Sequence, residues 1–184
     1  MDDSLAMLID WVRHRYFGKY RGSVTDNADP TNRARIKVRV PAVLGDLELW
    51  AMPCVPYAGD KVGAFFLPEA GTGVWVEFEA GDPSYPIWTG CFWQDDQLPD
   101  AATGASQKVL RTASATLLLD DDTPQIQAAV DDAGQVTIGD TVELKRDQTT
   151  HTVASDNVTA VVSSQKTALS QSSFSVNDGA LEVM

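Results

Sequence analysis

The chain has 184 residues and a formal net charge of −12, which argues against nucleic acid as a partner because affinity for phosphate comes largely from Lys and Arg. Fourteen of its fifteen aromatic residues lie at or before Trp93, and eight of its nine prolines lie before residue 100. The first half can therefore bury a conventional aromatic core, and the second half cannot.

Residues 1–18 are predicted to form an amphipathic helical segment, with the helix running from Ser4 to Phe17. Asp3 or Ser4 is the expected N-cap, and Gly18 is expected to end the helix. Apolar residues recur at 3/4 spacing: Leu5, Leu8, Ile9, Val12 and Tyr16. This apolar face either packs on the domain that follows or contacts a neighbouring protein. The segment is too short and too charged to span a bilayer and lacks the features of a signal peptide, so the chain is expected to fold in the cytoplasm.

Residues 19–94 are predicted to form five or six short strands. The clearest one runs from Arg35 to Val40, with every second residue apolar and Pro41 at its end. Strands are also expected over Tyr20 to Val24, around Leu49, and over Lys61 to Leu67. So few strands are too few for an ordinary sandwich and suit a small closed barrel.

The stretch from Gly73 to Trp93 predicts a strand pair with one buried face. Val74, Val76 and Phe78 alternate with Trp75, Glu77 and Glu79, and a turn centred on Asp82-Pro83 leads into a second strand over Ile87 to Trp93. Large aromatic residues are expected to hold this domain together as its core, and changing each to a small residue should cost roughly 2 to 5 kcal/mol if it is buried: Trp50, Trp75, Phe78 and Trp88.

These motifs occur in an order that resembles a known family. They are Gly22-x-Val24, Asp26-Asn27-x-Asp29-Pro30, Arg35-Ile36-Lys37-Val38-x-Val40-Pro41, Trp50-Ala51-x-Pro53, Pro56-Tyr57-Ala58-Gly59, Gly73-Val74-x-Val76-x-Phe78-Glu79-x-Gly81-Asp82-Pro83 and Pro86-x-Trp88-x-Gly90 with Trp93. Together, over residues 16–93, they resemble the OB-fold domain of the phage baseplate assembly protein V and spike family. That family includes the central spikes of contractile phage tails, of extracellular injection particles and of the type VI secretion apparatus.

Residues 95–107 indicate a polar connector, and residues 108–184 are rich in Thr, Ser, Gln and Asp. Short strand candidates alternate there with turn signals: Thr116–Leu119, Gln125–Val130, Gln135–Ile138, Thr141–Leu144, Thr152–Val153, Ser173–Val176 and Ala180–Val183. The segment around 152–171 could be strand or coil. This composition fits either a disordered tail or a β-solenoid whose apolar faces are buried only when several chains wrap together.

The family resemblance favours the second alternative. It implies that the OB barrel is followed by an intertwined trimeric β-helix, a needle formed by residues 108–184. The fold expected is therefore all-β, with an N-terminal helix, an OB-fold barrel and a C-terminal trimeric β-helix. In the family a small conical PAAR-repeat protein caps the needle tip, and a platform for such a cap is expected at the end of the chain: Ala180, Leu181, Glu182, Val183 and Met184.

No residue pattern predicts catalysis, a cofactor or a metal site. There is no Gly-x-Ser-x-Gly elbow, His-Glu-x-x-His motif or phosphate-binding glycine loop, and the two histidines, His14 and His151, suggest no dyad. The Asp120–Asp122 and Asp131–Asp132 runs are expected to be solvated turns rather than calcium ligands. Cys54 and Cys91 are expected to be buried thiols, with a disulfide as the alternative.

The sequence thus predicts a non-enzymatic central spike of a contractile phage tail or tail-like injection particle. Its expected partners are two further copies of itself, the hub and tube proteins of a baseplate, a PAAR-repeat tip protein and, on firing, the target cell envelope. The alternatives are a monomeric OB-type module that binds oligosaccharide or single-stranded nucleic acid and, remotely, a small hydrolase.

Overall fold

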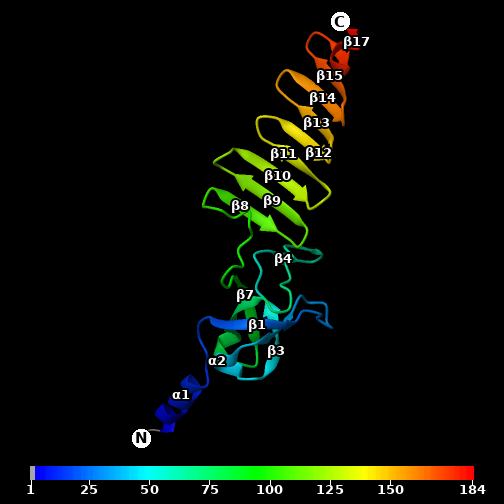
Figure 1. Ribbon diagram of the computed structural model, residues 1–184. Helices are drawn as coiled ribbons and strands as arrows, with labels where there is room; N and C mark the ends of the chain where they lie inside the picture. Colours follow the sequence, from blue (N-terminus) through cyan, green and yellow to red (C-terminus); the bar gives the residue numbers. More distant parts are fainter. Residues whose placement is uncertain (1–2) are drawn as a thin grey trace. The chain divides into compact units, whose positions relative to one another are not determined.

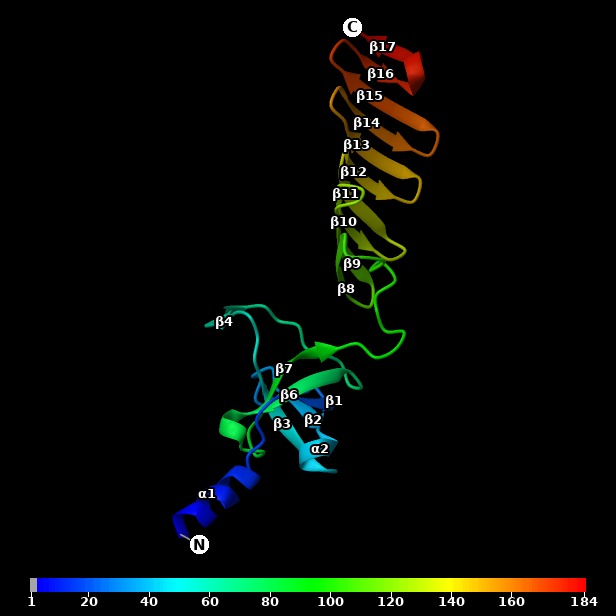
Figure 2. The same cartoon turned by 90° about the vertical axis from the view of Figure 1, so that its left-hand side faces the viewer.

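A computed structural model describes residues 3–184, and the chain folds as two units, Met1–Gln97 and Leu98–Met184 (Figures 1 and 2). Within residues 3–184, no helix combines the length and the apolar character needed to cross a bilayer.

The first helix, α1, covers Asp3–Arg13 and is shorter than predicted. Asp3 and Ser4, the predicted caps, lie inside it. It ends before Phe17 because the Tyr16 N–H donates to the Gly81 carbonyl oxygen (2.8 Å) and so leaves the helical pattern. This hydrogen bond to a distant turn takes the place of the bond that would continue the helix. The 3/4 spacing of the apolar residues contains no information about such a long-range contact.

Five strands within residues 3–97 close into a barrel in the order β1-β2-β3-β7-β6. Their bounds are β1 Tyr20–Asp26, β2 Ile36–Arg39, β3 Glu48–Pro53, β6 Gly73–Phe78 and β7 Pro86–Phe92. All neighbours are antiparallel except β3 and β7, which run parallel, and β6 closes the barrel by pairing with β1. The predicted small closed barrel is confirmed.

The barrel interior is mostly aliphatic. Its buried side chains are Val24, Ile36, Val38, Val40, Ala51, Val74, Val76, Phe78 and Trp88. The inward alternation predicted for β2 is confirmed, because Ile36, Val38 and Val40 are fully buried. Tyr16 and Tyr20 pack their rings against Phe78, with centroids 6.2 and 5.7 Å away, and cover the interior beside that ring.

One local prediction for this unit is wrong, and two short elements were not predicted. Pro41 ends β2 as expected but also starts an unpredicted one-turn helix, α2 (Pro41–Leu44), because proline is preorganised for a first helical position. The strand expected over 61–67 is only a two-residue hairpin, β4 (Ala58–Gly59) with β5 (Val62–Gly63), since Lys61 adopts a positive φ of 59° that interrupts extension. A 3-10 turn, η1 (Glu79–Gly81), leads from β6 toward β7.

Cys54 and Cys91 are exposed and free within the described part of the chain, so the expected burial is wrong. Cys54 directly follows β3, and Cys91 is the penultimate residue of β7. At such strand ends the barrel wall no longer covers a side chain, which a period-2 pattern cannot reveal.

Residues 98–184 form one ten-stranded antiparallel sheet in which each strand pairs with the next along the chain. The strands are β8 Gln107–Arg111, β9 Ala115–Asp120, β10 Gln125–Val130, β11 Gly134–Ile138, β12 Val142–Arg146, β13 Thr149–Val153, β14 Asn157–Val162, β15 Gln165–Ser170, β16 Phe174–Val176 and β17 Leu181–Val183. A 3-10 turn, η2 (Asn177–Gly179), precedes β17. The chain here is an ordered sheet, so the disordered-tail alternative is set aside.

Replacing Trp88 with alanine should destabilise the barrel by about 3 to 5 kcal/mol, because the indole is 5% exposed and its loss leaves a cavity. Urea unfolding followed by circular dichroism measures this. Trp93→Ala, at a residue 66% exposed, is the matched control and should change stability by no more than about 0.5 kcal/mol. Equal unfolding midpoints for the two variants would refute the assignment of Trp88 to the core.

Candidate assembly surfaces

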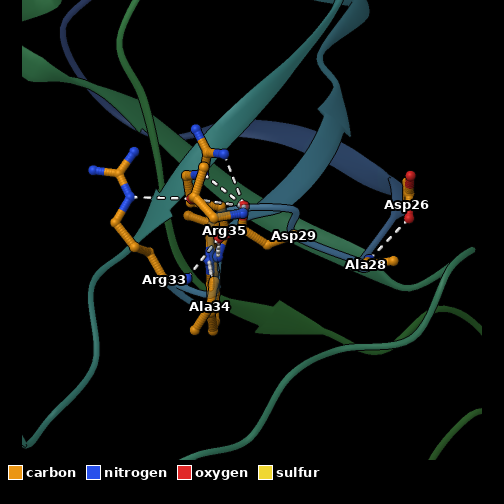
Figure 3. Close-up of polar contacts among 8 residues, drawn as sticks. Asp26, Ala28, Asp29, Arg33, Ala34 and Arg35 are labelled. Atoms are coloured by element: carbon orange, nitrogen blue, oxygen red, sulfur yellow. Dashed lines mark hydrogen bonds and ion pairs between the residues drawn. The ribbon is translucent and has the colours of Figure 1, made fainter.

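The loop between β1 and β2 is organised by the carboxylate of Asp29 (Figure 3). One oxygen, Oδ1, accepts hydrogen bonds from the Thr31 N–H (3.0 Å) and from Arg35 Nη2 (2.7 Å) and Nε (3.1 Å). The other, Oδ2, accepts from the N–H groups of Arg33 (2.8 Å) and Arg35 (3.3 Å). The Asp29 side chain is only 3% exposed, so one nearly buried carboxylate holds residues 29–35 of this loop in a fixed shape.

This loop is tied to both surfaces of the barrel wall. The Arg35 guanidinium lies over the Trp50 ring at 5.4 Å, on the outside. Ala34, in the same loop, accepts a hydrogen bond from Trp88 Nε1 (3.4 Å), whose ring belongs to the core. The Arg35 guanidinium, helped by the loop N–H groups, holds the pKa of the Asp29 carboxyl well below its usual range, although desolvation opposes the shift.

The four aromatic residues expected to form one core set are divided by the barrel wall. Phe78 and Trp88 are buried inside, whereas Trp50 and Trp75 are half-buried. Trp75 lies under the Arg21 guanidinium (5.5 Å) and beside the Phe92 ring (5.2 Å). Trp75 and Phe78 are three residues apart on one strand, so the pleat directs them to opposite faces, a consequence of period 2 that the sequence already contained.

An apolar hollow of about 530 Å³ adjoins the barrel beside the irregular segment 54–67. Pro53, Val55, Leu67 and Trp88 are among its lining residues, and Phe65 and Phe66 also line it while remaining 71% and 65% exposed. Exposed aromatic rings next to a hollow are the feature that a sugar-binding or base-stacking OB module would need.

The apolar face of α1 is uncovered. None of the residues of Asp3–Arg13 is buried, and Leu5, Leu8 and Val12 are each about half exposed. The expectation that this face packs on the barrel is therefore wrong. Its other predicted role, contact with a neighbouring protein, stays a prediction.

The largest uncovered apolar surface lies on the sheet of residues 98–184, in which no residue is buried. Strand pairing aligns one apolar side chain from each of nine consecutive strands into a continuous row across the sheet, which we call row 1. Its members are Leu119, Ile126, Ile138, Val142, Val153, Val158, Leu169, Phe174 and Val183. Lys108 of β8 stands at its start, opposite Leu119.

A second row, row 2, runs beside the first on the same face, two residues away along each strand. It contains Leu110, Leu117, Ala128, Val136, Leu144, His151, Ala160, Thr167, Val176 and Leu181. We call the surface formed by both rows the apolar face. His151 lies in row 2 between Leu144 and Ala160, and the structure gives it no metal-ligand neighbours within the described residues.

The opposite face of the same sheet is mainly polar. From β10 to β17, directly paired positions on it are Gln127, Thr137, Glu143, Thr152, Thr159, Ala168, Ser175 and Glu182, and the same row continues into β9 and β8 with the apolar Leu118 and Val109. The exposed fractions on the apolar face are large, for example 48% for Ile138 and 56% for Leu169. A contiguous apolar surface that is exposed to water marks a candidate site of protein contact.

The residues expected to form the tip platform lie at the end of this sheet. Leu181 and Val183 of β17 end rows 2 and 1, and Glu182 points to the polar face. All five residues from Ala180 to Met184 are exposed. β17 pairs with β16 on one side only, so its other edge presents free backbone groups.

The aspartate runs lie in hairpin turns and make ion pairs within the sheet. Asp121 binds Lys108, and Asp131 binds Arg111, each across neighbouring strands or turns. In the part of the chain that the structure describes, no three His, Cys, Asp or Glu side chains are grouped as they would be around a metal ion.

The Asp29 contacts make the folding stability of the barrel sensitive to acid. Because the folded-state pKa of Asp29 is depressed, its contribution to stability is complete above the unfolded-state pKa near 3.9 and declines as pH falls below that value. We expect Asp29→Asn to lower the melting temperature at neutral pH and to flatten its fall between about pH 5 and pH 2. Thermal melts across this range, with the exposed Asp60→Asn as control, test it; parallel wild-type and Asp29→Asn curves would contradict it.

Residues 20–93 match the sequence profile of a family described as the type VI secretion system/phage-baseplate injector OB domain. The matched segment begins at the first residue of β1 and ends one residue after β7, so it coincides with the closed barrel. No curated protein matches the chain. The match supports a baseplate-associated structural role, and the resemblance to the phage-baseplate and type VI secretion injector OB domain lies in residues 20–93.

Proposed function

We propose that the chain is the structural central spike of a contractile phage tail or tail-like injection particle, and that three copies form it. The observation that carries the proposal is the apolar face of the sheet in residues 98–184, which follows an injector-type OB domain in the same chain. A monomer would leave this face in water along all of rows 1 and 2.

Burial of the apolar face requires a second protein layer. A single sheet with no layer on either face lacks the buried area that stabilises a fold, because hydrophobic stabilisation grows with the apolar area removed from water. Copies of the same chain supply that layer most directly, since each brings an identical apolar face. Three sheets around one axis would turn rows 1 and 2 inward and leave the Thr, Ser and Gln side chains of the polar face in water.

The proposed mechanism is mechanical. The OB barrels of three chains form a collar that joins the hub and tube proteins to the needle, and sheath contraction drives the needle through the target cell envelope. Continuous backbone hydrogen bonds from β8 to β17 give the needle its stiffness. The particle is assembled in the cytoplasm of the producing cell, nucleic acid is not a partner, and no step requires a catalytic group.

The trimer is tested by a pair of variants at neighbouring positions on opposite faces. Val158→Asp places a carboxylate in row 1, between Val153 and Leu169, and should abolish the trimer because three charges would enter one apolar interior. Thr159→Asp, on the polar face between Thr152 and Ala168, should leave the trimer intact. Light scattering coupled to size exclusion reads both masses.

A wild-type mass of one chain would overturn the spike proposal. The hollow beside segment 54–67, with Phe65 and Phe66 exposed at it, would then support the alternative of a monomeric module for oligosaccharide or single-stranded nucleic acid. Binding of a glycan panel and of short single strands, lost in a Phe65→Ala/Phe66→Ala variant, would establish that alternative.

The tip platform is proposed to receive a PAAR-repeat protein. Val183→Asp should prevent capture of a small PAAR-repeat protein from the same genome in a pull-down, because the change puts a charge at the end of row 1. Glu182→Gln, one residue away on the polar face, is the control and should capture it normally. Failure of the wild-type trimer to capture it would refute the cap.

A further inference from the structure

Hairpin turns alternate between the two sides of the sheet in residues 98–184, so the sheet has two distinct margins (Figures 1 and 2). Margin A consists of the turns after β8, β10, β12, β14 and β16: residues 112–114, 131–133, 147–148, 163–164 and 177–180, together with the strand ends beside them. Margin B consists of the turns after β9, β11, β13 and β15: residues 121–124, 139–141, 154–156 and 171–173, together with their strand ends.

The two margins carry different charges. Margin A holds four of the five basic residues of residues 98–184, Arg111, Lys145, Arg146 and Lys166. It also holds four aspartates, Asp131, Asp132, Asp147 and Asp178, so its formal charges balance. Margin B is acidic and holds a single base, Lys108, beside Asp120, Asp121, Asp122, Asp140 and Asp156.

Contacts within the chain neutralise only some of these groups. On margin A, Arg111 binds Asp131 and Lys166 binds Asp178 (3.0 Å). In the part of the chain that the structure describes, neither Lys145 nor Arg146 has an ion-pair partner, although both are exposed.

Margin B has the larger excess of unpaired acidic groups, although Asp132 and Asp147 on margin A also lack an ion-pair partner among the described residues. Lys108 binds Asp121, which leaves Asp140 and Asp156 in turns of their own with no cation bound to them among the described residues. Asp156 accepts a hydrogen bond from the neighbouring Asn157 side chain (2.8 Å), and this bond leaves its charge uncompensated.

The unpaired bases stand at the rim of the apolar face. Arg146 lies opposite Thr149 and two residues beyond Leu144, and therefore projects from the apolar face at its margin-A end. Lys145 projects from the other face of the same strand end. Lys145 and Arg146 therefore project from opposite faces of the sheet at margin A. A second sheet that covers the apolar face would meet the first sheet at this margin, next to both side chains.

We infer that margin A of one chain binds margin B of a second copy, with Lys145 and Arg146 of the first chain paired to Asp140 and Asp156 of the second. The inference rests on the proposed trimer. Rotation about an axis along the stacking direction of the strands places unlike margins side by side. The turn after β12 lies one strand beyond the turn that contains Asp140 and one strand before the turn that contains Asp156, and one strand spacing is about 4.8 Å. Long basic side chains reach across that offset.

The charge difference also selects against wrong assemblies. An antiparallel pairing of two sheets at their edges would bring like margins together, and two B margins would oppose their aspartates with little basic charge between them. Because margin A of each chain binds margin B of the next, the chains are arranged head to tail around the axis. Such an arrangement can close into a ring.

Charge reversal in two halves tests the inference in the full-length protein. Lys145→Glu/Arg146→Glu and, separately, Asp140→Lys/Asp156→Lys should each lower the trimer association constant at low salt by at least about tenfold, and the four changes together should recover most of that loss. High salt should shrink the effect of each half, since exposed charges are screened. Lys61→Glu, a charge reversal in the barrel unit, is the control. Sedimentation equilibrium supplies the association constants.

The outcomes separate this inference from the proposed function. A wild-type trimer that is indifferent to both half reversals, or one that the combined variant does not restore, would overturn the pairing of margins and leave the spike proposal standing. A monomeric wild type would overturn both. Loss of the trimer in each half with recovery in the combined variant is the expected result, and misfolding of one half cannot produce it.

Discussion

The constraint on which the rest of this structure depends is that the strands of residues 98–184 satisfy one another's backbone groups but have no layer of protein over either face. Each strand pairs with its neighbours along the sheet, so the backbone hydrogen bonds between its strands form within one chain. The apolar side chains of rows 1 and 2, by contrast, remain exposed to water in a single chain. A sheet whose pairing is local and whose apolar face is uncovered would gain stability from a partner layer, and the proposed trimer would supply that layer.

The barrel both pairs its backbone groups and buries its apolar side chains within a single chain. Closure of β6 on β1 removes the free edges, and the aliphatic interior buries the inward side chains of all five strands. Asp29 adds a polar element that fixes the β1–β2 loop on both surfaces of the wall, through Arg35 and Trp50 outside and through Ala34 and Trp88 inside. The domain that matches the injector family is therefore the part with a core of its own.

In the sheet unit, the apolar face and the charged margins would have different effects on assembly. The apolar face requires partners but does not specify how many or in which direction, since any apolar surface would cover it. The unequal margins restrict the choice, because pairing margin A with margin B brings Lys145 and Arg146 to the acidic margin, whereas two B margins would oppose their aspartates. Affinity would come from the face and specificity from the margins, a division common in protein interfaces.

The sequence by itself determined what depends on local pattern. The alternation of Ile36, Val38 and Val40 predicted a one-sided strand, the ordered Gly, Pro and Trp motifs predicted the barrel and its family, and the Asp-rich turns predicted most hairpins of the second unit. β8 was missed because its adjacent apolar residues, Val109 and Leu110, show no alternation, and α1 was predicted too long. The segment that holds β14 and β15 was left open between strand and coil because its periodicity is mixed. Only the tertiary structure decided that Trp88 lies inside the wall, how Asp29 gathers its donors and how register aligns rows 1 and 2. These features depend on contacts between residues far apart in the chain, and local pattern carries no record of them.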